Sequence, residues 1–122
     1  MTGLDTNVLL AWLLDGQARA LTGGPRYRVS HVVLAEIAWV LATTFKRPRN
    51  QIAAVISGLA DAADVVIDRE AVVRAALADY RAGSADFADH LIARENEAAG
   101  CDTTLTLDRK AARHPAFTLL GR

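Results

Sequence analysis

Residues 3–14 read GLDTNVLLAWLL, and this stretch decides how the chain begins to fold. The run 8–14 is too uniformly apolar for a helix with one face in water. We therefore expect a buried strand end at 3–4 that passes into a buried helix. Asp5 stands at the junction, where a carboxylate either caps the following helix or belongs to a site at the end of the strand.

The same alternation of strand and helix patterns continues along the chain. Thr22 to Pro25 (TGGP) is a break between elements. Ser30 is a suitable N-cap for the helix that follows it, and Gly100 is a suitable stop for the last long helix. Alternating elements predict an α/β fold in which helices cover both faces of a parallel sheet. The expected strands are 27–29, 65–67, 103–107 and 117–120, and the expected helices are 32–45, 50–60, 69–82 with Asp68 as cap, 86–99 and 108–113.

Composition predicts one globular domain, residues 1–122. Apolar residues make up 52% and charged residues 23%, and Lys+Arg and Asp+Glu are 14 each, which gives a formal net charge of zero. A protein that binds duplex nucleic acid through many phosphates carries an excess of cations, so any nucleic-acid contact here must be local, metal-mediated or completed by a second subunit. The single cysteine, Cys101, excludes an internal disulfide and a multi-cysteine zinc site. No membrane-spanning run or signal peptide is found, which predicts a cytoplasmic protein.

Several carboxylates occur where their surroundings do not explain them. Asp108 follows a predicted strand and starts a predicted helix, as Asp5 does, and a helix cap is the alternative reading of both. Glu36 is the only carboxylate between Ser30 and Phe45, and its neighbours one helical turn away are apolar. We expect it to be buried, and therefore to hold a cation, accept hydrogen bonds or be protonated.

Asp86 and Asp89 lie three residues apart in the first turn of a predicted helix. The helix dipole explains Asp86 well, but it explains Asp89 less well because Asp89 is a full turn in. These carboxylates and those that close the strands can converge on one pocket. Oxygen ligands favour Mg²⁺ or Mn²⁺, which would neutralise their repulsion and support phosphodiester hydrolysis.

Four stretches, taken in order, resemble the motifs of PIN-domain ribonucleases. They read LDTNVLL at 4–10, VLAEI at 33–37, ADFADHLIA at 85–93 and TLTLDR at 104–109. The resemblance implies a three-layer α/β/α sandwich with a central parallel sheet, and Mg²⁺- or Mn²⁺-dependent endonuclease cleavage of RNA. Small members resemble VapC-type toxins of type II toxin–antitoxin pairs, which implies a homodimer and a cognate antitoxin protein as partner.

The resemblance also implies roles for individual residues. Asp5 and Asp89 would be the strongest metal ligands, and Asp86 would be an additional or alternative one. Residues 15–24 form a shorter segment than relatives have, and Leu107 stands where an aromatic residue is common. The implied acidic cluster is Asp5, Glu36, Asp89 and Asp108; the residues that orient its ligands are Thr6, Asn7 and Thr106; the RNA contacts are Arg109 and Lys110.

Two other functions fit parts of the pattern. One is a catalytically inactive PIN-fold binding or regulatory module, but the presence of all the acidic residues argues against it. The other is a metal-dependent phosphatase. That chemistry requires a second aspartate two residues after the first, and this chain has Asn7 at that position. The histidines have no metal-ligand spacing and are expected at the surface, while the tryptophans are expected in the core or a dimer interface. These residues are His31, His90, His114, Trp12 and Trp39.

Overall fold

A computed structural model describes residues 1–15 and 26–121. The chain divides into two compact units, Met1–Glu70 and Ala71–Arg122, and each is described by itself. The predicted break at 22–25 lies outside the described residues, as does all of the short segment 15–24 except Asp15. Both units combine helices with parallel strands, so the predicted α/β class is confirmed.

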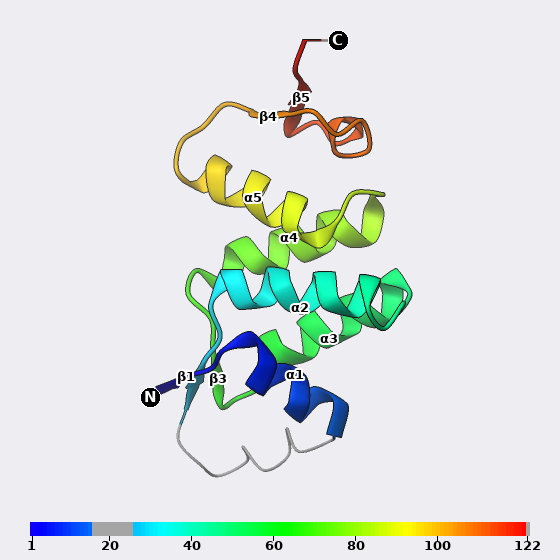
Figure 1. The fold of residues 1–122 in the computed structure, drawn as a ribbon. Coiled ribbons are helices and arrows are strands. Elements are labelled where there is room, and N and C mark those ends of the chain that lie inside the picture. Colours follow the sequence, from blue (N-terminus) through cyan, green and yellow to red (C-terminus); the bar gives the residue numbers. More distant parts are fainter. Residues whose placement is uncertain (16–25, 122) are drawn as a thin grey trace. The chain divides into compact units, whose positions relative to one another are not determined.

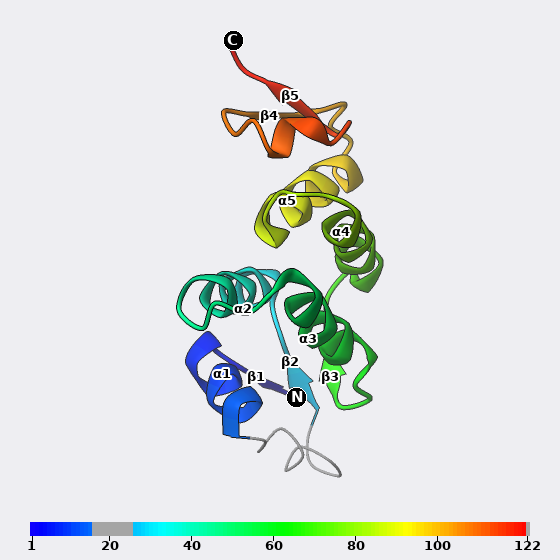
Figure 2. The same ribbon diagram turned by 90° about the vertical axis from the view of Figure 1, so that its right-hand side faces the viewer.

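The first unit has a three-stranded parallel sheet with three helices (Figures 1 and 2). Thr2 pairs with Tyr27 and Arg28 pairs with Val66, in the strand order β1-β2-β3. Helix α2 packs against both α1 and α3, and α3 also contacts β3. The elements are β1 (Thr2–Gly3), α1 (Thr6–Asp15), β2 (Tyr27–Arg28), α2 (His31–Thr43), α3 (Arg49–Asp61) and β3 (Val65–Val66).

Helix α2 begins as the sequence predicts. The Ser30 side chain accepts a hydrogen bond from the backbone N–H of Val33, which satisfies one of the free donors at the helix start. Leu34 and Ile37 are completely buried on its inner face. The apolar spacing of this segment therefore matches the observed core.

In the first unit, the expectations for α1 and for Asp68 are wrong. Helix α1 is not buried all round, because Val8 and Leu14 are 41% and 45% exposed and only Leu9 lies fully in the core. Asp68 does not cap the next helix, which starts at Glu70. The Asp68 carboxylate instead pairs with the guanidinium of Arg28 on β2. The guanidinium gives the carboxylate a charge-assisted, oppositely charged partner on β2.

The second unit pairs two helices with a two-stranded parallel sheet. Gly100 adopts a φ of 98° just after α5, in the left-handed region that glycine enters without strain, and it ends the helix as predicted. Phe87 is buried and packs edge-on against Tyr80, with ring centroids 5.9 Å apart. The elements are α4 (Glu70–Ala82), α5 (Phe87–Ala98), β4 (Thr104–Thr106), the 3₁₀ helix η2 (Ala111–Arg113) and β5 (Phe117–Leu119).

The parallel pairing of strands is thus found in both units, in sheets of three and two strands. No helix among the described residues is long and apolar enough to cross a membrane. Trp12 packs edge-on against Tyr27, as expected of a residue near the core, whereas Trp39 is 62% exposed on α2 and lies outside it.

Candidate functional site

Asp5 lies between β1 and α1, where its side chain caps the helix. Its Oδ1 accepts a hydrogen bond from the backbone N–H of Val8 at 3.0 Å. Among the described residues this is the only bond of the Asp5 carboxylate, so Oδ2 is open to a further partner. A capping role and a ligand role are therefore compatible for this residue.

Glu36 receives a hydrogen bond from Thr6, the residue next to Asp5. The Thr6 hydroxyl donates to Glu36 Oε1 at 2.7 Å, which joins the start of α1 to the middle of α2. Thr6 therefore holds the Glu36 carboxylate, and its role in orienting a metal ligand stays a prediction. Asn7 is exposed one position further along α1.

The expected burial of Glu36 is wrong. Glu36 is exposed, and its apolar neighbours Val32 and Trp39 are themselves 68% and 62% exposed. The apolar residues around Glu36 thus continue onto the outer side of α2 and do not enclose its carboxylate. What distinguishes Glu36 is the Thr6 hydroxyl that holds it.

Three further predicted acids belong to the second unit. Asp86 occupies the N-cap position of α5 without a side-chain cap bond, and Asp89 follows in the first turn. Asp108 comes two residues after β4, and its Oδ1 accepts the backbone N–H of Lys110 at 2.8 Å. Thr106 accepts the backbone N–H of Asp108, so it shapes the turn but does not touch the carboxylate.

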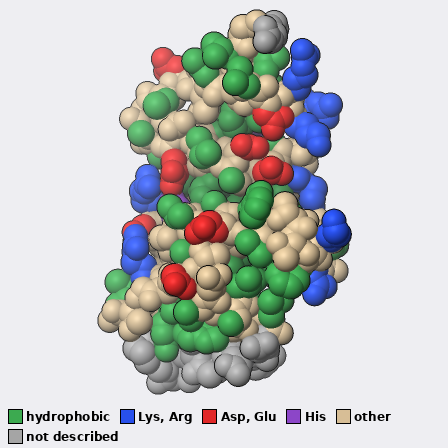
Figure 3. All heavy atoms as spheres, viewed as in Figure 1, with side chains coloured by type: hydrophobic (Ala, Val, Ile, Leu, Met, Phe, Trp, Pro, Cys, Tyr) green, Lys and Arg blue, Asp and Glu red, His purple; other side chains and the backbone are tan. Residues whose placement is uncertain are grey.

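Asp86 and Asp108 both lie within electrostatic range of Asp89. Partial burial raises the pKa of the Asp89 carboxyl above its usual 3.8, and the negative charges of Asp86 and Asp108 raise it further. Acidic side chains gather on the face drawn in Figure 3, around the position of α5 in Figure 1, with Lys and Arg side chains beside them. Such mutual repulsion favours a bound cation.

The structure thus brings the predicted acids together in two groups. Asp5 and Glu36, linked through Thr6, belong to the first unit. Asp89 lies with Asp86 and Asp108 in the second unit. A single cluster that includes all five remains a prediction from the sequence.

Replacing the repelled carboxylate should stabilise the metal-free protein. We expect Asp89→Asn to raise the thermal midpoint at pH 7, because the amide carries no charge to desolvate or to repel Asp86 and Asp108. The raised pKa contributes stability below pH 3.8 that is lost as the pH rises through the folded-state value, so the gain should be small at pH 4 and complete at pH 7.

Calorimetry with and without Mn²⁺ checks this prediction. Mn²⁺ should raise the midpoint of the wild type and of the exposed control Asp102→Asn, and should have much less effect on Asp89→Asn. A lower midpoint for Asp89→Asn in the absence of metal would show that this carboxylate is a structural residue.

A second group of polar side chains was not anticipated from the sequence. Asp79, His90 and His114 each place one ligand-type atom within 4.8 Å of the others. His90 is 1% exposed, so its expected surface position is wrong. The helical spacing could have indicated this burial, because His90 lies on the same buried side of α5 as Phe87 and Leu91. His114, also expected at the surface, is only partly exposed and packs edge-on against His90, with ring centroids 5.3 Å apart.

The bonds of Asp79 and His114 do not fit metal ligation. Both oxygens of Asp79 accept hydrogen bonds from Arg94, at 2.6 and 2.9 Å. His114 Nδ1 accepts the backbone N–H of Ala116 at 3.1 Å, so Nε2 carries the proton of the neutral ring and faces Asp79 Oδ1 at 3.4 Å. A metal-bound histidine normally donates from its other nitrogen, which is the opposite arrangement.

Asp79 is therefore the centre of a structural ion pair. Burial alone would raise the pKa of its carboxyl, but the hydrogen bonds and charge of Arg94, with His114 beside them, hold the pKa below its usual value. The pair ties α4 to α5, and His114 ties both to the segment after η2.

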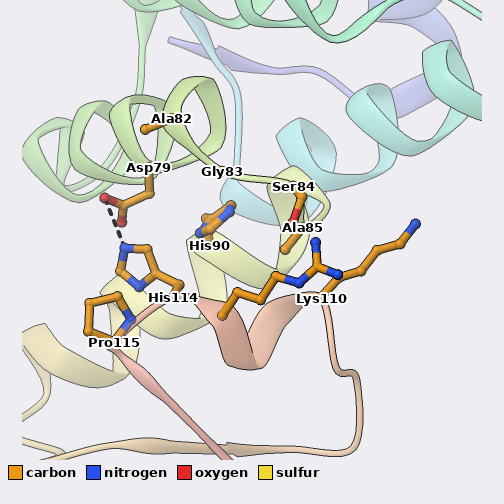
Figure 4. A pocket seen from close by; sticks show the side chains of 10 residues that line it. Asp79, Ala82, Gly83, Ser84, Ala85, His90, Lys110, His114 and Pro115 are labelled. Atoms are coloured by element: carbon orange, nitrogen blue, oxygen red, sulfur yellow. Dashed lines mark ion pairs between the residues drawn. The ribbon is translucent and has the colours of Figure 1, made fainter.

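A cavity of about 440 Å³ opens beside this ion pair (Figure 4). The side chains of Asp79 and His114 face each other at one side, and His90 lies between them and Ser84. Its full lining is Asp79, Ala82, Gly83, Ser84, Ala85, His90, Lys110, Arg113, His114 and Pro115.

Compared with models of protein families, with curated proteins and with solved structures, the chain gives no match.

Proposed function

We propose that this chain is a metal-dependent endoribonuclease, with residues 1–122 forming a single PIN-like domain. The observation that carries the proposal is that carboxylates gather in the second unit beyond the end of a parallel strand, where the partly buried Asp89 lies within electrostatic range of Asp86 and Asp108. Carboxylates that repel one another lower the stability of the protein unless a cation joins them, and ligands gather where parallel strands end. Asp108 follows the parallel strand β4, and Asp5 follows β1.

The proposed architecture is a three-layer α/β/α sandwich with a central parallel sheet. The predicted catalytic residues are Asp5, Glu36, Asp89 and Asp108. Both units already contain parallel strands followed by acidic residues, which supports the proposal.

The proposed roles of these residues differ. Asp5, Asp89 and Asp86 would hold Mg²⁺ or Mn²⁺, which when bound polarises a phosphodiester and lowers the pKa of water. Asp5 is oriented for this by its bond to the backbone of α1, and Glu36 by the hydroxyl of Thr6. Glu36 and Asp108 would position the ion or the attacking water, and Arg109 and Lys110 would contact the RNA backbone.

The biological setting we propose is that of a type II toxin. The chain would act in the cytoplasm on RNA and would be inhibited by a cognate antitoxin protein. The zero net charge means that one copy offers no excess of cations to a polyanion, which favours a homodimer as the form that binds RNA.

Metal removal is the direct test of this function. Purified protein should cut single-stranded or structured RNA in Mg²⁺ or Mn²⁺, and a chelator should stop cleavage until the metal is restored in excess. Gel analysis of end-labelled RNA would follow the reaction. Cleavage that continues in chelator would refute the metal mechanism. RNA binding without cleavage at any metal concentration would favour the inactive binding module.

A further inference from the structure

We propose that the cavity of the second unit is a phosphate subsite, where Lys110 and Arg113 bind a backbone phosphate of the RNA. The RNA part of this proposal rests on the proposed function, whereas the binding of phosphate does not. Both cations line the cavity and both are exposed. Neither side chain forms an ion pair within the described part of the chain, so both are available to an anion.

The one carboxylate in the cavity wall does not oppose an anion strongly. Asp79 accepts two hydrogen bonds from Arg94 and faces the Nε2–H of His114, so its charge is compensated inside the protein. The cations among the residues that line the cavity are Lys110 and Arg113. A guanidinium and an ammonium are the two side-chain groups that bind phosphate best.

The size and lining of the cavity suit a phosphate that carries a sugar. About 440 Å³ lies within the usual range for ligand pockets and exceeds what a bare phosphate needs. Ala82, Ala85 and Pro115 supply apolar contacts. The wall is tight at Gly83, where an added Cβ would stand 3.1 Å from the Asp79 carbonyl oxygen and 3.3 Å from His90 Nε2.

Two segments that line the cavity also carry acids of the second unit. Ser84 and Ala85 line the cavity and directly precede Asp86. Lys110 lies two residues after Asp108, whose carboxylate accepts its backbone N–H. Two residues of chain span at most about 7 Å, so a phosphate in the cavity lies close to the proposed metal ligands. One RNA strand can then contact both places.

The first test is a titration with inorganic phosphate, followed through the backbone amide signals of the isotope-labelled protein in chelator. We expect signals of residues 83–85 and 113–114 to move and to saturate. Arg113→Ala should weaken binding about tenfold, as expected for a lost charge-assisted bond, and Lys110→Ala should weaken it to a lesser degree. The control Arg81→Ala removes an exposed arginine outside the cavity and should change nothing.

The same variants decide whether phosphate binds here. If Arg113→Ala and Lys110→Ala titrate like the wild type, the subsite proposal is wrong. Both replaced side chains are exposed, so unchanged thermal midpoints are expected and would show that any loss of binding is local.

A second set of measurements identifies the source of the phosphate. Short RNAs with and without a 5′-phosphate are titrated in chelator at low salt and followed by fluorescence anisotropy. Equal affinity for both RNAs, with an approximately tenfold loss in Arg113→Ala, supports a backbone phosphate. Tenfold tighter binding of the 5′-phosphorylated RNA would show that the cavity binds a terminal phosphate and not a backbone phosphate. RNA affinity that is unchanged in Arg113→Ala would overturn the assignment to RNA.

Failure of this proposal is distinct from failure of the nuclease proposal. Metal-dependent cleavage by a protein that binds no phosphate in the cavity would refute only the subsite proposal. Phosphate binding that depends on Arg113, in a protein that never cleaves RNA, would refute only the nuclease proposal.

Discussion

Asp5→Asn is expected to lower the rate of RNA cleavage about a thousandfold. A bound metal supplies several kcal/mol of transition-state stabilisation, and each 1.36 kcal/mol corresponds to a factor of ten in rate. The amide of asparagine is a much weaker ligand for Mg²⁺ or Mn²⁺ than the carboxylate. Single-turnover cleavage of a labelled RNA at saturating Mn²⁺ would measure the loss.

The substitution is specific because asparagine caps helices as well as aspartate does. The bond from the Val8 N–H to the side chain at position 5 is therefore kept, and the thermal midpoint should stay within a few degrees of the wild type. Asp102→Asn, which removes an exposed carboxylate from the second unit, should cleave at the wild-type rate. Wild-type activity of Asp5→Asn would exclude this residue as a ligand and leave it as a helix cap.

Arg94→Ala is expected to lower the free energy of unfolding by about 3 kcal/mol. It removes two hydrogen bonds from Asp79, whose side chain is only 11% exposed, and leaves that charge beside the ring of His114. Breaking a buried pair from one side typically costs 3–5 kcal/mol, and partial exposure of Arg94 places this pair near the lower end. Urea unfolding at pH 7 would measure the change.

The exposed partner of Arg94 provides the control. Glu97 bonds to the same guanidinium at 3.1 Å but is 62% exposed, so Glu97→Ala should cost less than about 1 kcal/mol. The pKa of Asp79 lies below its usual value of 3.8, so its pairing stabilises the protein above that pH and is lost as the pH falls through the lowered value. The difference between wild type and Arg94→Ala should therefore shrink in acid. Equal stabilities at pH 7 would contradict the structural role of the pair.

Local signals in the sequence were sufficient for most of the secondary structure. Ser30 caps α2 and Gly100 ends α5 because both depend on the residue itself and its nearest backbone neighbours. The ends of β1 and β4 next to Asp5 and Asp108 also follow from short-range patterns, and both aspartates bond to backbone N–H groups two or three residues ahead.

Features that depend on distant residues were not predicted. Asp68 was expected to cap a helix, but Arg28 lies forty positions away in sequence and beside it in space. The pairing of Asp79 with Arg94 and His114 likewise joins three separate elements. Glu36 has apolar neighbours on its own helix, yet whether they are covered depends on what packs over α2.

The sequence by itself determined the α/β alternation, the positions of the helix caps and the carboxylates worth testing, because hydrophobic period and capping chemistry act over a few residues. Only the tertiary structure decided that Glu36 is exposed and held by Thr6, and that Asp89 is repelled by Asp86 and Asp108. Burial and electrostatic repulsion depend on distances through space. Those distances are set when helices and strands pack, and no local pattern in the chain encodes them.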